Sequence, residues 1–400
     1  MRIAFVDHSA VSGGGIIRYG TQLAKAIAQS DKEIRITYFT HQDNYTNNKS
    51  LFDECSSFFQ LQILAHTRQG LVRNRYLDMV LKKLLPSNGS KKLSQEIISR
   101  TKDFDVVYFT CAHTTDHVEV IPPVFGTFHD LNSKYLFGLP LFAKKDAADI
   151  GRQLGKWFEK ANIIVSTPFI REEILKFYPA VKREIDVVFL PNLAEKITVN
   201  AQAAVLKKLH IDKPYILYPA AFMPHKNHNN LFNAFWKLMD RSDLKGKYLL
   251  VLSGKGTNHF EYGTAISTGV QAADASDFNI RGLGYLSNED MDMVIKGASL
   301  IISTSLYEAG SGPALDAWIN EIPLIMSNIR PHLDQLAFFG IHCNTFDPMD
   351  TNDIYQQLDH ALHNTDAMKE RSRDAVGKLS SYTWADTARH YLDIFKKKSL

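Results

Sequence analysis

The sequence lacks the long apolar runs that a membrane-spanning helix requires. No stretch approaches the roughly 20 consecutive apolar residues needed to cross a bilayer, and the mean hydropathy is slightly negative, at −0.19. These properties exclude an integral membrane protein. The first 15 residues, MRIAFVDHSAVSGGG, contain one arginine and a short apolar run that leads directly into glycines, without the long apolar region of a signal peptide. We therefore expect a first β-strand here and a cytoplasmic protein.

Cysteine is scarce. The three cysteines, Cys55, Cys111 and Cys343, are odd in number and far apart in the sequence. They provide neither a disulfide framework nor the paired CxxC motifs of a structural zinc site. We expect reduced thiols that are mostly buried.

An excess of charge is also absent. The chain has 46 basic and 43 acidic residues, a net charge of +3, which gives no support for nucleic-acid binding. Locally, nine basic and only two acidic residues lie between Arg68 and Lys102. Within this stretch, residues 73–85 form a helical pattern with one apolar and one basic face. This pattern fits an ordinary packed helix with a solvated basic side, or a peripheral contact with anionic lipid.

What the sequence does contain is an alternation of short apolar runs and amphipathic helical stretches, which is typical of βα units around parallel sheets. Because 400 residues exceed a usual single core, we predict two Rossmann-like domains. The expected strands of the first domain are residues 3–6, 35–39, 106–109, 125–128, 163–166 and 186–189. Those of the second are residues 215–218, 248–253, 280–283, 300–303 and 323–327. The predicted helices are residues 17–28, 229–239, 288–296, 312–320, 351–363 and 384–397.

Three segments at expected strand ends carry candidate binding residues. Ser12 to Gly15 follow the first strand and open a helix, so that backbone N–H groups face an anion, although glycine turns are common at this position. Lys226 lies between a strand and a helix, where it neutralises a diphosphate or is simply solvated. In the third segment, small residues surround Glu308, and Gly312 starts a helix in whose first turn we place Asp316. First-turn acids are common, so structure alone would explain Asp316 but not Glu308.

Taken together and in order, these segments resemble the GT-B glycosyltransferases of the large retaining group, family 4, in a branch that builds polysaccharides such as O-antigens. The family has an E-x7-E element in its C-terminal domain, and here Glu308 is followed eight positions later by Asp316. The resemblance covers nearly the whole chain and rests on the stretches VSGGGIIRY, FHDLNSKY, FMPHKNHNNLFNA, GLGYLSNEDM, YEAGSGPALDAW and IPLIMSN. It implies two domains that face each other across a cleft, with a last helix that crosses back to the first domain.

The resemblance also implies domain boundaries. It places an acceptor-binding domain at residues 1–195, a linker at 196–212, a nucleotide-sugar-binding domain at 213–380 and the returning helix at 381–400. The implied activity is transfer of a sugar from a nucleotide-diphosphate sugar to a saccharide or lipid-linked acceptor, with retention of anomeric configuration. No cofactor or metal is expected, and the partners are the donor, the acceptor and an anionic membrane surface, with no nucleic acid.

Carried over by position, the resemblance assigns roles to residues. Lys226 resembles the residue that binds the donor diphosphate, Glu308 the acid that contacts the transferred sugar, and Asp316 the ribose-binding acid. His129 matches a histidine near the anomeric centre. The remaining donor-binding candidates are backbone positions: Gly14, Gly15, Gly284, Tyr285, Gly310, Ser311 and Gly312.

Two departures from the family pattern leave alternatives open. Many relatives have an arginine where this chain has Ala220, and the second glutamate is replaced by Asp316. These departures keep a non-catalytic sugar-nucleotide-binding subunit as an alternative. A GT-B nucleotide-sugar epimerase, which shares the fold and the donor, is a second alternative. A nicotinamide-dependent dehydrogenase fits less well, because the glycine loop lacks the dinucleotide fingerprint.

The spacing of His113 and His117, four residues apart, would suit two zinc ligands on a helix face. No third ligand lies nearby in the sequence, and polar loop residues fit this pair better. No DxD motif occurs at the position that a metal-chelating transferase needs, so we predict no catalytic metal.

Overall fold

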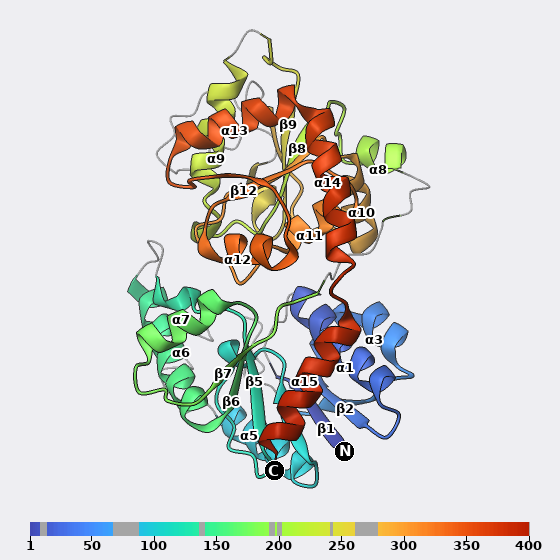
Figure 1. Cartoon of the computed structure of the whole chain (residues 1–400), viewed down its shortest axis with the longest axis vertical. Coiled ribbons are helices and arrows are strands. Elements are labelled where there is room, and N and C mark those ends of the chain that lie inside the picture. The colour runs from blue at the N-terminus through green and yellow to red at the C-terminus, as the bar shows by residue number, and fades with distance from the viewer. Residues whose placement is uncertain are drawn as a thin grey trace. The chain divides into compact units, whose positions relative to one another are not determined.

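The computed structural model describes residues 1–8, 14–66, 88–135, 141–191, 197, 202–240, 243–260 and 279–399. The chain divides into two units. Of the described residues, those up to Pro191 and those from Thr383 onward form the first unit, and those from Ile197 to Tyr382 form the second (Figure 1). The basic helix predicted at residues 73–85, most of the stretch at 192–201 and the glycine-loop residues 9–13 lie outside the described residues.

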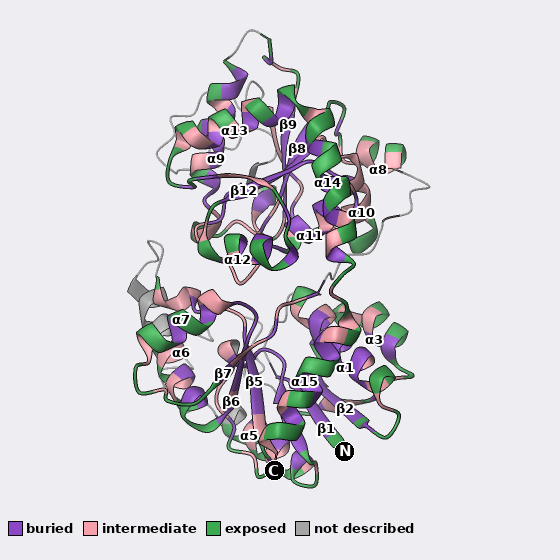
Figure 2. Ribbon diagram, viewed as in Figure 1, coloured by how far each residue is buried: buried purple, intermediate pink, exposed green. Residues whose placement is uncertain are grey.

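The first unit is built on a seven-stranded parallel sheet with the order β3-β2-β1-β4-β5-β6-β7. Its strands are mostly buried apolar runs (Figure 2), as expected for a parallel sheet covered on both faces. The strands are β1 (Arg2–Asp7), β2 (Arg35–His41), β3 (Gln60–Leu64), β4 (Val106–Phe109), β5 (Val124–Phe128), β6 (Asn162–Val165) and β7 (Ile185–Val187). The helices are α1 (Gly14–Ser30), α2 (Gln42–Asn47), α3 (Lys49–Cys55), α5 (Asn88–Thr101), α6 (Leu141–Lys160) and α7 (Pro168–Phe177), with 3-10 turns η1 (Ala112–Thr114) and η2 (Asn132–Lys134).

The second unit repeats the architecture with a six-stranded parallel sheet in the order β10-β9-β8-β11-β12-β13. Its strands are β8 (Tyr215–Pro219), β9 (Leu249–Ser253), β10 (Ile280–Gly282), β11 (Leu300–Ser303), β12 (Leu324–Ser327) and β13 (Asn344–Phe346). The helices are α8 (Gln202–Lys208), α9 (His228–Met239), α10 (Asn288–Gly297), α11 (Gly312–Ile319), α12 (Arg330–Phe339), α13 (Thr351–His363) and α14 (Thr365–Leu379), with η3 (Pro224–Lys226) and η4 (Thr257–Phe260).

Strand order reverses once in each sheet, and these two places position the candidate sites. In the first unit β2 lies on one side of β1 and β4 on the other, and in the second unit β9 and β11 flank β8. Connections that leave such neighbouring strands diverge, which opens a crevice beyond the carboxyl ends of the strands. The predicted site residues follow β1, β5, β8, β10 and β11, and therefore lie at the carboxyl edges of the two sheets.

The last helix, α15 (Trp384–Lys398), belongs to the first unit and lies along α1 (Figure 1). The helix begins with a capping box, in which the side chains of Thr383 and Asp386 each accept a hydrogen bond from the other residue's backbone N–H. Its apolar face joins the core of the first unit through Ala388, Tyr391, Leu392 and Phe395. The predicted return of this helix to the first domain is therefore confirmed.

The predicted pair of parallel-sheet Rossmann-like domains is confirmed. The sequence pattern did not indicate β3, β13 or the helices α2, α3, α5, α6, α7, α8, α12 and α14. Among the described residues, no helix is both long and apolar enough to span a bilayer.

Candidate functional site

Lys226 lies in a turn that is fixed by hydrogen bonds from two strand ends. Tyr218 in β8 donates its hydroxyl to the Lys226 carbonyl at 2.7 Å, and the Thr304 hydroxyl after β11 donates to the same oxygen at 3.1 Å. The next residue, Asn227, adopts a left-handed backbone conformation (φ 59°), which asparagine tolerates better than most residues. Its side-chain amide donates to the Pro348 carbonyl at 2.7 Å. These contacts hold the Lys226 backbone at the switch point of the second sheet.

Glu308 is brought to Lys226 from the neighbouring strand connection. The Lys226 ammonium donates to Glu308 Oε1, and the Ser305 hydroxyl donates to the same oxygen at 2.6 Å. The two charged side chains keep about a fifth of their surface exposed, 20% for Lys226 and 18% for Glu308. The ion pair is therefore partly desolvated but open to a ligand, a setting in which charge-assisted hydrogen bonds are strong.

The electrostatics of this pair keep the glutamate ionised. Burial raises the pKa of Glu308, but the positive charge of Lys226 and the hydrogen bonds from Lys226 and Ser305 lower it more, so that the net pKa is below the usual glutamate value. An ionised carboxylate accepts hydrogen bonds from hydroxyl groups. At neutral pH the site thus presents one fixed anion and one cation.

Behind Glu308, buried hydroxyls and a histidine connect β11 to β12. Ser327 donates its hydroxyl to the Ser305 carbonyl at 2.7 Å, and His332 Nδ1 lies 2.9 Å from the Ser327 carbonyl. Burial lowers the pKa of His332, while the charge of Glu308 raises it in part. The sequence reasoning missed Ser305 and His332. In the sequence, the two residues are marked only by small polar residues at two strand ends. The fold brings the two strand ends together, which the sequence pattern does not indicate.

The small-residue loop before α11 is fixed by its own hydrogen bonds. Ser311 caps α11 by accepting a hydrogen bond from the Ala314 N–H at 3.2 Å, and its own N–H donates to Gln335 Oε1 at 2.9 Å. The predicted use of the Ser311 amide for a phosphate would therefore require Gln335 to move. A side chain added at Gly312 would meet nothing within 4 Å, so one side of this loop is open.

Asp316 does not occupy the first turn of α11, so that prediction is wrong. It is the fifth residue of the helix, whose first turn contains no acid. Attraction to the helix N-terminus falls off within the first turn and therefore does not explain this aspartate.

Gly284 and Tyr285 follow β10 at the edge of the same sheet. Gly284 has a positive φ of 67°, and a Cβ there would approach Asn258 at 3.2 Å, so both the backbone conformation and the space favour glycine. Its N–H donates to the Thr257 hydroxyl at 3.0 Å and its carbonyl accepts from the Gly254 N–H at 2.7 Å. Tyr285 is 76% exposed, so its ring is free to contact a ligand.

In the first unit, Gly14 and Gly15 form the first turn of α1, and a side chain at Gly15 would meet nothing within 4 Å. His129 follows β5. Its ring Nε2 lies 3.2 Å from the Thr110 carbonyl, and Tyr19 packs edge-on against the ring with centroids 4.9 Å apart. Burial and the nearby His113 lower the pKa of His129 to about 4. His129 is thus a neutral imidazole at physiological pH.

The structure separates the two histidines that were considered as zinc ligands. His113 pairs with Asp130, whereas His117 packs on Trp157 with ring centroids 4.8 Å apart. Within the described ranges, no group of three or more histidine, cysteine, aspartate or glutamate side chains is arranged to hold a metal ion.

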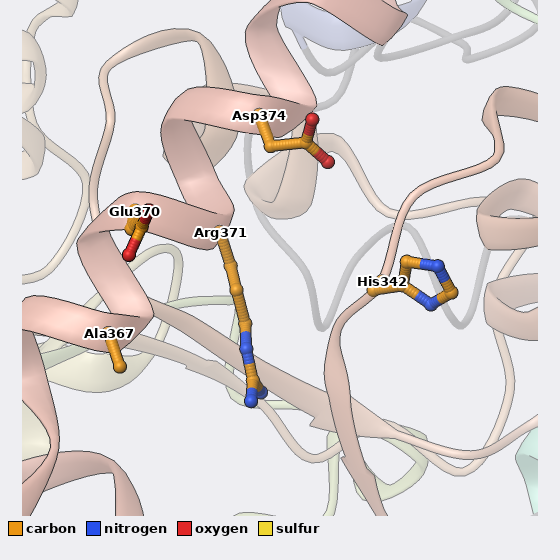
Figure 3. A pocket seen from close by; sticks show the side chains of 5 residues that line it. All are labelled: His342, Ala367, Glu370, Arg371 and Asp374. Atoms are coloured by element: carbon orange, nitrogen blue, oxygen red, sulfur yellow. The ribbon is translucent and has the colours of Figure 1, made fainter.

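A pocket of about 580 Å³ lies elsewhere in the second unit (Figure 3). Glu370, Arg371 and Asp374 line it from α14, and His342 lines it from the segment that enters β13. The amino ends of parallel strands lie opposite the edge where open α/β sheets bind ligands. None of the predicted site residues lines this pocket, and we do not assign the site to it.

Residues 203–376 match the family model described as "Glycosyl transferases group 1". O-antigen chain mannosyltransferase B of Escherichia coli is 22% identical over 276 residues, which cover 68% of this chain and 69% of that protein. WaaG, described as a glycosyltransferase involved in lipopolysaccharide biosynthesis, has a TM-score of 0.67 and 12% identity, and the match covers 98% of this chain and 99% of WaaG. Anabaena HepE, crystallised with UDP-glucose, has a TM-score of 0.65 and 12% identity, with 99% and 100% covered.

These solved structures show the fold of the chain, which is the GT-B fold. Residues 203–376, which match the group 1 glycosyltransferase model, include Lys226 and Glu308.

Proposed function

We propose that the chain transfers a sugar from a nucleotide-diphosphate donor to a saccharide or lipid-linked saccharide acceptor, with retention of anomeric configuration, in the synthesis of a bacterial surface polysaccharide. The second unit binds the donor and the first unit binds the acceptor. The similarity to an O-antigen mannosyltransferase makes mannose the first sugar to test. We further propose that the protein works in the cytoplasm, with peripheral membrane contact, and without a metal or other cofactor.

The Lys226–Glu308 pair carries this proposal. Both charges lie at the switch point of a sheet, within the residues that match the group 1 glycosyltransferase model. When the bond between sugar and diphosphate breaks, negative charge grows on the leaving phosphate, and the Lys226 ammonium stabilises it there more than in the ground state. Glu308, which Lys226 then no longer neutralises, accepts hydrogen bonds from the hydroxyls of the transferred sugar.

In the proposed reaction Glu308 takes no part in proton transfer. Front-face displacement uses an oxygen of the leaving diphosphate to take the proton of the acceptor hydroxyl. In this scheme the protein supplies positioning and charge stabilisation, and His129 provides a neutral polar contact near the reacting carbon.

The first test identifies the donor by the rise in melting temperature when UDP-, GDP- and ADP-sugars are added, because a ligand that binds only the folded state stabilises it by mass action. Lys226→Ala should then weaken binding of both nucleoside diphosphate and intact donor, and slow single-turnover transfer by roughly two orders of magnitude. Lys237→Ala is the matched control, since this lysine lies on the neighbouring helix α9 and its ammonium donates a hydrogen bond to Asn352, which is not one of the predicted site residues. Unchanged affinity and rate in Lys226→Ala would remove this residue from the site.

The products separate the remaining alternatives. A transferase releases free nucleoside diphosphate when an acceptor is present, whereas an epimerase converts the donor without acceptor-dependent release. A binding subunit gives the thermal shift without turnover on any acceptor tested. Retention is read from the anomeric proton coupling of the product by NMR, and an inverted product would refute the retaining assignment.

A further inference from the structure

His113 is held on both sides of its ring by groups from the next strand of the sheet. Its Nε2 lies 3.3 Å from Asp130 Oδ2, and its Nδ1 lies 3.3 Å from the backbone nitrogen of His129. The other oxygen of Asp130 accepts a hydrogen bond from the Asn132 N–H at 3.1 Å. The carboxylate is thus fixed by two contacts and in turn fixes the imidazole.

These contacts define the tautomer in which His113 supports its neighbour. The His129 N–H is a donor, so His113 Nδ1 must carry a lone pair, and the ring proton is therefore on Nε2 and is donated to Asp130. On the other side of His129, the ring Nε2 faces the Thr110 carbonyl, which also accepts. This contact places the His129 proton on Nε2 and leaves its Nδ1 as an acceptor. Backbone and ring of His129 are thus oriented by separate partners.

We propose that His113, oriented by Asp130, is a positioning residue that fixes His129 through the His129 backbone N–H at the carboxyl edge of the first sheet. The proposal rests on the proposed function, in which His129 lies beside the reacting carbon. Positioning of this kind matters because displacement of a reacting group by about 1 Å can cost on the order of a hundredfold in rate.

Protonation of His113 breaks this arrangement. A proton on Nδ1 would oppose the His129 N–H, and the sulfur of Cys111, 3.6 Å away, would become the partner of Nδ1 instead. The side chain is only 9% exposed. Burial lowers its pKa, but the charges of Cys111 and Asp130 raise it more, so that the net pKa is well above the usual histidine value. The rate of transfer should therefore rise with pH as His113 loses its proton, above the range in which histidine usually titrates.

The groups that face His113 come from three elements. Cys111 is on its own turn, Asp130 and His129 follow β5, and Tyr19 from α1 packs on the far side of His129. Helix α6 also packs against η1. Three charged residues of α6 act on the pKa of His117, and these are Lys156, Glu159 and Lys160. The titration that limits the rate is therefore expected from His113 and not from His129, whose pKa is about 4.

Two amide substitutions separate the two hydrogen bonds of His113. In His113→Asn the side-chain oxygen can replace Nδ1 as acceptor of the His129 N–H, but the Nε2 donor is lost. In His113→Gln the amide nitrogen can replace Nε2 as donor to Asp130, but the acceptor is lost. We expect His113→Gln to reduce kcat/KM by roughly tenfold or more on the alkaline plateau of the pH–rate profile, whereas His113→Asn stays within about threefold of the unmodified protein there and lacks the His113 titration. His117→Asn, which changes a nearby histidine outside this arrangement, is the matched control and should behave like the unmodified protein.

A second variant keeps the test independent of whether the His113 variants fold. Asp130→Asn removes the negative charge that raises the His113 pKa, so the acid limb of the pH–rate profile should shift to lower pH. A limb that does not move, or equal losses in His113→Asn and His113→Gln when both are folded by circular dichroism, would overturn the positioning role.

NMR of protein labelled with ¹⁵N-histidine and ¹⁵N backbone distinguishes failure of this inference from failure of the proposed function. The His129 amide resonance should shift with pH together with the His113 ring titration, whether or not any sugar is transferred. If no transfer is found with any donor, the proposed function fails while this coupling still tests the contact. A His129 amide that is insensitive to the His113 titration contradicts the inference even in an active enzyme.

Discussion

His228, the first residue of α9, is the least satisfied buried side chain near the candidate site. It is 2% exposed, and neither ring nitrogen makes a hydrogen bond of good geometry in the described part of the chain, although the Ala220 backbone is close enough to raise the pKa of the ring in part. The ring packs instead among aromatic side chains, with centroids 4.9 Å from Tyr218 and 5.0 Å from Phe222. Burial, followed by the charges of Lys226 and His225, lowers the pKa of His228 to about 3. The imidazole is therefore neutral at all physiological pH values.

The substitution His228→Phe should raise the stability of the second unit. An unsatisfied buried polar group costs about 1–3 kcal/mol, and phenylalanine of similar shape removes this cost. The folded-state pKa of His228 is depressed below the unfolded value near 6.5. The folded protein therefore loses stability as pH falls from about 6.5 towards 3, because the unfolded state binds a proton more readily. The gain in the phenylalanine variant should therefore be larger at pH 5 than at pH 8. Thermal unfolding at both values checks this, and equal or negative shifts would contradict the account.

The substitution Glu308→Gln should separate donor binding from turnover. The amide keeps the shape of the side chain but loses the charge, so transfer should slow by about two orders of magnitude while donor affinity changes little. Near-normal turnover would exclude Glu308 from the site. The exposed Glu289 on α10 provides the control Glu289→Gln, which should be neutral.

The same glutamate gives a prediction for stability. Its folded-state pKa lies below the usual value, so its contribution is present above about pH 4.3 and is lost as pH falls through the folded-state pKa. The difference in melting temperature between unmodified protein and Glu308→Gln should therefore shrink below pH 4. A difference that stays constant from pH 7 to pH 3 would mean that the ion pair does not stabilise the fold.

At the scale of the element, α15 is connected to the first unit by a buried group of hydroxyls. Tyr391 lies 2.5 Å from the Tyr19 hydroxyl and 2.9 Å from the Thr127 hydroxyl, and Tyr108 lies 2.6 Å from Thr127. Tyr19 also packs against the His129 ring. The helix therefore supports the same region that holds the predicted histidine.

Tyr391→Phe tests this contact. It removes one hydroxyl and leaves the partners Tyr19 and Thr127 with fewer hydrogen bonds in a buried place, which should cost about 1–3 kcal/mol. Chemical denaturation followed by tryptophan fluorescence measures the loss. The comparison variant is Phe395→Leu, which changes packing on the same helix without removing a polar group. No loss in Tyr391→Phe would show that the hydroxyl group contributes little.

The elements that could be predicted from sequence are those with a strong local pattern. The strands of residues 106–109 and 300–303 and the helix of residues 351–363 were predicted with their observed bounds, because each is a buried apolar run or a well-capped amphipathic helix. The strand Gln60–Leu64 was missed because it is a half-buried edge strand with two glutamines. The strand Asn344–Phe346 was missed because three residues carry no periodic signal.

The candidate site divides along similar lines. Lys226 could be singled out because it lies between an expected strand and an expected helix, and Glu308 because it stands among small residues at an expected strand end. Their pairing across 82 positions could not be seen, because strand order within the sheet decides it. The pairing of His113 with Asp130 was missed for the same reason, since sequence spacing directed attention to His117.

At the scale of the whole molecule, the first unit is discontinuous in sequence and the second is nearly continuous. A chain that ends after Tyr382 should therefore lose the stability of the first unit, which would lack the apolar face of α15 in its core. The second unit should remain folded and bind the nucleotide donor that the proposed function assigns to it. Calorimetry of the truncated protein should show one retained transition that shifts with nucleotide. Two intact transitions would show that α15 is dispensable.

The discontinuity also has a consequence for biosynthesis. About 190 residues of the second unit leave the ribosome between Pro191 and Thr383, which takes roughly 10–40 s at bacterial rates of elongation. During this interval α15 has not been synthesised, so the residues of α1 that it contacts and the Tyr19 hydroxyl lack this partner. The nascent first unit is therefore a client for chaperones that bind apolar surface, and ribosome stalling within the second half of the message would leave it exposed to aggregation and proteolysis.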